Sequence, residues 1–195
     1  MRNLFSFVGL TRLETAEIIK PYFHQMKNEK NLDWNFVNKC WKKPYREAQY
    51  IGVYYLMKFC KKLKKEDLEK VKQLVIEKSW WDTIDLIATN VVGKIVLLDR
   101  EKLEKIMLKW SVDDNFWIKR VAILHQLKYK KETNENLLEK ILLNNFGTKE
   151  FFINKAIGWA LREYSKTSKQ FVKKFIEKYK HQMSNLSIRE GSEYI

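Results

Sequence analysis

Apolar residues recur every three or four positions along most of this chain, a spacing that places them on one face of an α-helix. The clearest stripe consists of Ile84, Ile87, Val91 and Ile95. Runs that alternate apolar and polar residues, as half-buried strands do, are nearly absent. The pattern predicts an all-α protein with helices over residues 11–28, 34–41, 44–61, 65–78, 80–97, 100–110, 115–130, 134–145, 149–166 and 168–180.

Two helix starts carry recognisable capping signals. Thr11 is followed three residues later by Glu14, which is the pattern of a capping box, and Pro21 predicts a kink within the same helix. Ser79 precedes a helix whose acid, Asp82, comes three residues on. We therefore expect Ser79 and Asp82 to cap that helix.

The longer helices repeat at a fixed interval. Overlaying them at an offset of 35 residues brings Tyr50, Asp85, Arg120 and Lys155 to equivalent positions. Helix pairs with this period are typical of an α-solenoid, here of the HEAT-like kind. Because equivalent positions in a solenoid line one surface, we expect these side chains to converge on a concave basic groove.

The helices leave little of the chain for a second unit. We expect one domain over residues 1–195, with residues 1–10 as a segment that connects into the first helix. The polar ending, about 181–195, is expected to fray. Only six Gly and two Pro occur, which agrees with long helices and short connections.

The charge balance adds a candidate partner. Lys and Arg number 38 against 24 acidic residues, a net charge of +14. Such an excess indicates a polyanion, with nucleic acid first, although lysine used as a general surface residue would give the same composition.

Other functional classes have no support in the sequence. Cys40, Cys60 and the three histidines are too scattered for a metal site, and no nucleotide-cofactor motif or nucleophile elbow occurs. With no signal peptide and no membrane-spanning run, we expect a cytoplasmic monomer without metal or cofactor.

Trp81 and Asp85 lie four residues apart, on a helix face other than the apolar stripe. One turn into the helix, Asp85 is too deep to cap it. It is either an ordinary surface acid, an ion-pair partner of Arg120, or a carboxylate that faces a developing cation such as an oxocarbenium-like sugar. Arg120 lies on a stripe of its helix that is otherwise apolar. Its planar guanidinium can donate two parallel hydrogen bonds, which suits either a DNA phosphate or a bridge to the carboxylate of Asp85.

A third group of residues lies on one face of the helix 149–166. Lys155, Arg162 and Lys166 surround Trp159 at helical spacing. Cations that follow phosphates beside an aromatic ring are what a nucleic-acid surface needs. The alternative is a tryptophan packed under the aliphatic stems of basic residues.

The remaining candidates are expected to be structural. His125 has apolar neighbours, and packing between helices is expected for Trp34, Trp41, Trp80, Trp110 and Trp117.

Three stretches resemble the AlkD family of HEAT-like repeat DNA glycosylases: Ser79-Trp-Trp-Asp-Thr-Ile-Asp85, Asn115-Phe-Trp-Ile-Lys-Arg-Val-Ala-Ile-Leu-His-Gln-Leu-Lys-Tyr-Lys130 and Phe151-Phe-Ile-Asn-Lys-Ala-Ile-Gly-Trp-Ala-Leu-Arg-Glu-Tyr-Ser-Lys166. The family removes cationic N3- and N7-alkylated purines from duplex DNA without flipping the base. By this resemblance Trp81 and Trp159 pack against the deoxyribose, Asp85 stabilises the sugar cation and positions water, and Arg120 holds a phosphate. Further DNA contacts are expected from Lys128, Lys155, Arg162 and Lys166.

The beginning of the chain departs from the family pattern. Family members begin with an additional helical pair that helps to hold DNA, whereas this sequence starts where that pair ends. We therefore expect double-stranded DNA to bind weakly and excision to be reduced or absent. The alternatives are a fully active glycosylase and a non-enzymatic scaffold whose surface binds protein or structured nucleic acid.

Overall fold

The computed structural model describes residues 4–195, which fold into helices joined by short connections. The helices follow the predicted order, and most of the predicted ranges are correct to within a few residues. They are α1 (Arg12–Gln25), α2 (Trp34–Lys42), α3 (Arg46–Lys58), α4 (Asp67–Ile76), α5 (Trp81–Ile87), α6 (Gly93–Val96), α7 (Arg100–Trp110), α8 (Phe116–Leu124), α9 (Glu135–Leu143), α10 (Phe151–Ser165), α11 (Lys169–Tyr179) and α12 (Asn185–Gly191).

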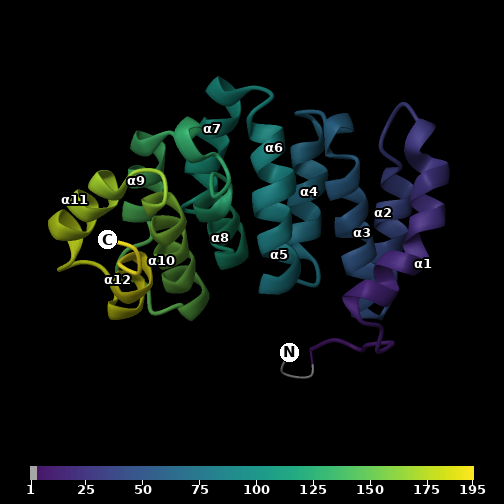
Figure 1. Cartoon of the computed structure of the whole chain (residues 1–195), viewed down its shortest axis with the longest axis horizontal. Coiled ribbons are helices and arrows are strands. Elements are labelled where there is room, and N and C mark those ends of the chain that lie inside the picture. The colour runs from purple at the N-terminus through teal and green to yellow at the C-terminus, as the bar shows by residue number, and fades with distance from the viewer. Residues whose placement is uncertain (1–3) are drawn as a thin grey trace.

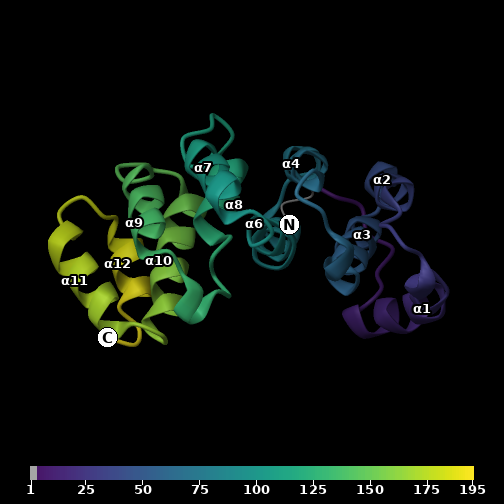
Figure 2. The same cartoon turned by 90° about the horizontal axis from the view of Figure 1, so that it is seen from above.

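The helices stand side by side in the order of the chain, from α1 to α11 (Figure 1). Seen from above, the row bends into an arc, with α1, α3, α6 and α10 toward its inner side and α2, α4, α7 and α9 toward its outer side (Figure 2). Helix α8 contacts α5 and α10, so it joins the central helices to the last repeat. This two-layered row is the all-α solenoid that the period predicts.

One cluster of buried apolar side chains runs along the whole row, from Ile19 in α1 to Met183 before α12. Its members include Val53, Ile84 and Ile118, all of them completely buried. Helices α1 to α11 therefore each contribute apolar residues to this cluster, and their burial holds neighbouring repeats together.

The two predicted caps have different outcomes. Thr11 and Glu14 form the expected capping box: each side chain bonds the other residue's backbone N–H. The prediction for Ser79 is wrong, because its hydroxyl donates to the carbonyls of Val75 and Ile76 at the end of α4. Helix α5 starts after Trp80, which makes no side-chain cap.

The predicted helix 80–97 contains a wider turn in its middle. The segment Ala88–Val92, between α5 and α6, is a π-helix. Next to it, Gly93 allows α8 to come close, since a Cβ there would lie 2.5 Å from the carbonyl oxygen of His125. The hydroxyl of Tyr129 donates to the Gly93 carbonyl at 2.6 Å. Single π-turns of this kind occur often at functional sites, and this one directly follows the turn that bears Asp85.

The segment before α1 does more than connect. The N–H groups of Val8 and Gly9 donate to the carboxylate of Glu47 at 3.0 and 2.8 Å, and the N–H of Arg46 donates to the Ser6 carbonyl at 2.8 Å. These bonds hold the segment across the start of α3. Among residues 4–195, no helix combines the length and the apolar character needed to cross a bilayer.

The expectation that residues 181–195 fray is wrong for most of this range. They include α12, which packs along α10 and begins with a cap from Ser184 to the N–H of Ser187. Contact is close because Gly158 has no side chain: a Cβ there would meet the Cβ of Glu190 at 2.5 Å. The polar composition is misleading here, since the polar residues of α12 bond to α10.

Candidate functional site

A buried ion pair joins the start of α3 to the start of α5. Arg46 is fully buried, and its guanidinium bonds both carboxylate oxygens of Asp82, the hydroxyl of Thr83 at 2.7 Å and the carbonyl of Lys78 at 2.8 Å. Tyr50 donates a further hydrogen bond to Asp82 at 2.6 Å. The principal role of Asp82 is therefore to pair with Arg46. The prediction that it caps α5 is met only in part, because its Oδ1 also accepts a hydrogen bond from the backbone N–H of Thr83 at 2.8 Å.

A second pair of the same kind lies one turn further on. The Nε and Nη2 atoms of Arg120 donate to the two oxygens of Asp85 at 2.7 and 2.8 Å, and Nη1 donates to the carbonyl of Phe152. The side chains are 4% and 13% exposed, respectively. Of the interpretations left open by the sequence, the bridge between Arg120 and Asp85 is the one that the structure contains.

The environment of Asp85 changes its acidity. Burial raises the pKa of its carboxyl above the ordinary value, and the bidentate contact with Arg120 opposes that rise. The backbone around it is fixed as well, because the hydroxyl of Thr89 donates to the Asp85 carbonyl at 2.8 Å across the π-turn. Asp85 is thus a carboxylate held in place by one cation, with a small part of its surface open to solvent.

The tryptophans divide into two groups. Trp80, Trp117 and Phe152 pack together at ring-centroid distances of 4.9 to 5.9 Å. Trp41 and Trp110 are buried in the core and Trp34 packs against it, so the prediction that these five tryptophans pack between helices is confirmed. Trp81, the neighbour of Trp80, is 47% exposed instead. Trp159 is half-buried and packs against the core from α10. An indole as open as Trp81, one turn before a buried acid, is available to a ligand.

The basic face of α10 is matched by Glu190 of α12 and by Glu193, which follows that helix. Lys155 pairs with Glu190 at 2.8 Å, and Arg162 pairs with Glu190 at 3.1 Å and with Glu193 at 2.7 Å. These contacts lower the pKa of Glu190 below its ordinary value, the hydrogen bond from Lys155 having the largest effect. The predicted phosphate-binding cations of α10 are therefore partly neutralised by the protein's own carboxylates.

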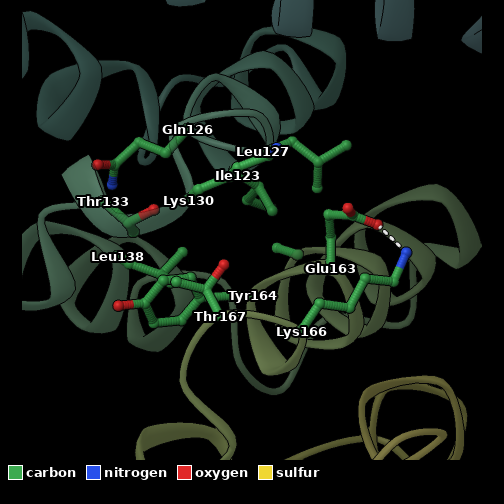
Figure 3. Close-up of a pocket in the computed structure, with 11 residues that line it drawn as sticks. Ile123, Gln126, Leu127, Lys130, Thr133, Leu138, Glu163, Tyr164, Lys166 and Thr167 are labelled. Carbon is green, nitrogen blue, oxygen red and sulfur yellow. Dashed lines mark hydrogen bonds and ion pairs between the residues drawn. The ribbon is translucent and has the colours of Figure 1, made fainter.

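Lys166 is likewise engaged. It pairs with Glu163 at 2.6 Å on the edge of a pocket of about 350 Å³ between α8 and α10 (Figure 3). Lys128 differs from these residues, since its ammonium donates to the amide oxygen of Asn90 at 2.5 Å and has no carboxylate partner within residues 4–195. Of the predicted DNA-contacting lysines and arginines, Lys128 is the one whose charge is not already balanced.

His125 behaves as a structural residue, as predicted. It is fully buried, and its Nδ1 lies 2.7 Å from the carbonyl oxygen of Ala122. Burial lowers its pKa to about 4, so the ring is neutral at physiological pH. In the part of the chain that the structure describes, no cluster of three His, Cys, Asp or Glu residues is placed to hold a metal ion.

The sequence reasoning missed Arg46 and Glu190, although the period contained a signal for both. Arg46 precedes Asp82 by 36 residues, just as Asp85 precedes Arg120 by 35. Lys155 and Glu190 continue the series with the same separation of 35. Opposite charges one repeat apart therefore mark contacts between neighbouring repeats, a criterion that the sequence prediction did not apply.

Comparison with known proteins agrees with this architecture. The model of a family described as DNA alkylation repair enzyme matches residues 1–195. The structure of a predicted DNA alkylation repair enzyme from Enterococcus faecalis is 32% identical, with a TM-score of 0.88 over 100% of this chain and 90% of that one. The chain belongs to the DNA alkylation repair enzyme family.

A more distant structure has the same fold. That of smu.31 from Streptococcus mutans UA159 superimposes with a TM-score of 0.66 over 93% of this chain and 97% of that chain. At 18% identity, this likeness concerns the fold alone. No similar protein was found among curated sequences.

Proposed function

We propose that this protein binds double-stranded DNA across the surface that bears Trp81, Asp85 and Trp159, and that it slowly excises N3- and N7-alkylated purines. The observation that carries the proposal is the pairing of an open tryptophan, Trp81, with a fixed and partly buried carboxylate, Asp85, one helical turn away. Family membership supplies the DNA-repair context.

The proposed chemistry uses the charge of Asp85. In an alkylated purine the base already carries a positive charge, so the bond between C1′ and the base nitrogen breaks with its electron pair going to the base, which leaves neutral. The sugar becomes an oxocarbenium-like cation, which a carboxylate nearby stabilises. Water then adds to C1′ and loses a proton. Because the base is a good leaving group, no general acid is required.

Binding is proposed to be weak, because the principal cations already have partners. Arg120 uses three of its donor atoms on Asp85 and Phe152, and Lys155 and Arg162 are paired with Glu190. A DNA phosphate must displace these partners before it gains any interaction of its own, so much of the Coulomb attraction is offset by this exchange.

A release assay tests the proposal. Duplex DNA carrying 7-methylguanine is incubated with an excess of wild-type protein or of Asp85→Asn, and the free base is measured. We expect slow release by the wild type and a decrease of at least about 10-fold in the variant, since one well-placed charge is typically worth a few kcal/mol of transition-state stabilisation.

Asp82→Asn provides the matched control. It also removes a carboxylate from a buried arginine, one turn earlier on the same helix, so its effect on folding resembles that of Asp85→Asn. Equal rates in both variants would contradict a chemical role for Asp85. If the wild-type protein binds this duplex but releases no base, the excision activity is excluded and the alternative of a non-enzymatic scaffold is favoured.

A further inference from the structure

Helices α1 and α3 stand at the opposite end of the row from α10 (Figure 1). The residues of these two helices and of the turns after them line a large cleft. Its volume is about 760 Å³. Residues of α1 and of the 3₁₀ turn after it form one rim, from Arg12 to Lys27, and Lys58, Lys61 and Lys62 form part of the other. At 1.5 Å per residue the first rim is about 22 Å long, enough for a short run of nucleotides.

The charge of this cleft is entirely of one sign. The side chains that line it include Arg12 and five lysines but no carboxylate; the lysines are Lys20, Lys27, Lys58, Lys61 and Lys62. Within residues 4–195 none of these cations forms an ion pair, in contrast to those of α10, although the ammonium of Lys62 donates to the carbonyl oxygens of Met26 and Lys27. Like charges in one concavity repel each other and raise the local potential, so the cleft favours a polyanion.

The floor of the cleft is apolar. It consists of Ala16, Ile19, Phe23 and Phe59, with Tyr54 half-buried at its edge. The guanidinium of Arg12 lies 6.0 Å from the centre of the Tyr54 ring. A regular duplex keeps the flat faces of its bases stacked inside the helix, whereas an unpaired nucleotide can place the face of its base on an aromatic ring.

We propose that the α1–α3 cleft binds single-stranded nucleic acid, with phosphates on the cationic rims and a base against Tyr54 and the apolar floor. Cationic rims beside an aromatic ring are how proteins bind single strands with little regard to sequence. The proposal is independent of the excision chemistry at Asp85. An anionic lipid would meet the same charge, and the experiment below includes it as an outcome.

The test measures binding of a fluorescent oligothymidine by anisotropy at low salt. The cleft variant Lys20→Glu/Lys58→Glu/Lys61→Glu is compared with Lys102→Glu/Lys109→Glu/Lys140→Glu, which changes the same charge at exposed lysines of α7 and α9. We expect the affinity of the cleft variant to fall at least about 10-fold further than that of this control. Its affinity should also depend less on salt. In a plot of the logarithm of the binding constant against the logarithm of the salt concentration, the slope should become shallower by about 0.7 for each phosphate that the variant no longer binds.

Stacking is tested separately. Tyr54→Leu and an abasic oligonucleotide of the same length should each reduce affinity by about 5-fold or more, because stacking of one base on an aromatic ring is worth about 1–3 kcal/mol. Thermal unfolding shows that each variant is folded. Unchanged affinity in both comparisons would mean that phosphates alone are bound, which overturns the single-strand assignment.

Three other results would also overturn it. Equal decreases in the cleft and control variants would show attraction by net charge alone, and an equal decrease for duplex and single strand would make the cleft part of a duplex surface. Cleft-dependent binding of phosphatidylglycerol vesicles with unchanged oligothymidine affinity would assign the cleft to lipid. The cleft variant should still release 7-methylguanine, and Asp85→Asn should still bind oligothymidine, so this proposal and the proposed function fail separately.

Discussion

Arg120 and Asp85 are joined by two parallel hydrogen bonds of 2.7 and 2.8 Å, across 35 residues of sequence and between α8 and α5. The third donor of the arginine, Nη1, bonds the Phe152 carbonyl at the start of α10. One guanidinium thus links three consecutive repeats and also sets the position of the proposed catalytic carboxylate. Stability and chemistry are coupled at this pair.

Replacing one member of the pair should destabilise the fold strongly. Arg120→Ala leaves the Asp85 carboxylate buried without its partner, and we expect the free energy of unfolding to fall by about 3–5 kcal/mol. Asp85→Ala should have a similar effect, and the double variant should cost clearly less than the sum. Urea unfolding followed by circular dichroism measures all three. Additive effects would show that the two side chains are not energetically coupled.

The excision rate should begin to fall at a higher pH than the pKa of an ordinary aspartate would give. Asp85 acts as an anion in the proposed mechanism, and burial raises its pKa above the ordinary value of an aspartate. As the pH falls, the rate should therefore decline at a higher pH than an exposed aspartate would give. Single-turnover rates across the acid range measure this, with heat-inactivated protein as the control for spontaneous base release. A profile that stays flat to the ordinary aspartate pKa would be inconsistent with this role.

Glu190→Gln should tighten DNA binding. The change removes the carboxylate shared by Lys155 and Arg162, which leaves more positive charge on α10 for phosphates. We expect affinity for duplex DNA to rise by about 3-fold to 10-fold, and the salt dependence to steepen as each freed cation binds a phosphate. Glu177→Gln on α11 makes the same charge change at an exposed site and serves as the control. The same increase in affinity in both variants would mean that net charge is responsible.

Trp81→Ala should reduce function much more than stability. Because the side chain is 47% exposed, we expect the free energy of unfolding to change by less than about 1 kcal/mol. Removal of an aromatic ring that is proposed to pack on DNA should lower excision by roughly 5-fold to 100-fold. Leu98→Ala, at a residue that is 55% exposed, controls for removal of an open apolar side chain. Normal excision by Trp81→Ala would remove this tryptophan from the proposed site.

Local signals in the sequence were sufficient for much of the fold. The apolar stripe of Ile84, Ile87 and Val91 predicted a buried face, and all three residues are completely buried. The 35-residue period predicted that Asp85 and Arg120 occupy equivalent helices, and the structure brings them into contact. Such features depend on helical spacing alone, which is why a single sequence reveals them.

The errors concern partners that are distant in the sequence. Asp82 accepts one backbone N–H in the first turn of α5, as a capping acid does, yet its stronger, charge-assisted bonds are to the buried guanidinium of Arg46. Residues 181–195 have the composition of a loose tail, but the missing side chain of Gly158 lets α12 approach α10. Neither outcome follows from local propensity.

The sequence by itself determined that this protein is an all-helical repeat array, because the period of its apolar residues fixes both the helices and their stacking. It also indicated the residues at which chemistry is proposed. Only the tertiary structure decided the state of their charges: which cations are paired, as Lys155 is with Glu190, and which are left open, as in the cleft between α1 and α3. The physical reason is that an ion pair depends on distances of a few ångströms between helices, and residue spacing along one chain does not fix those distances.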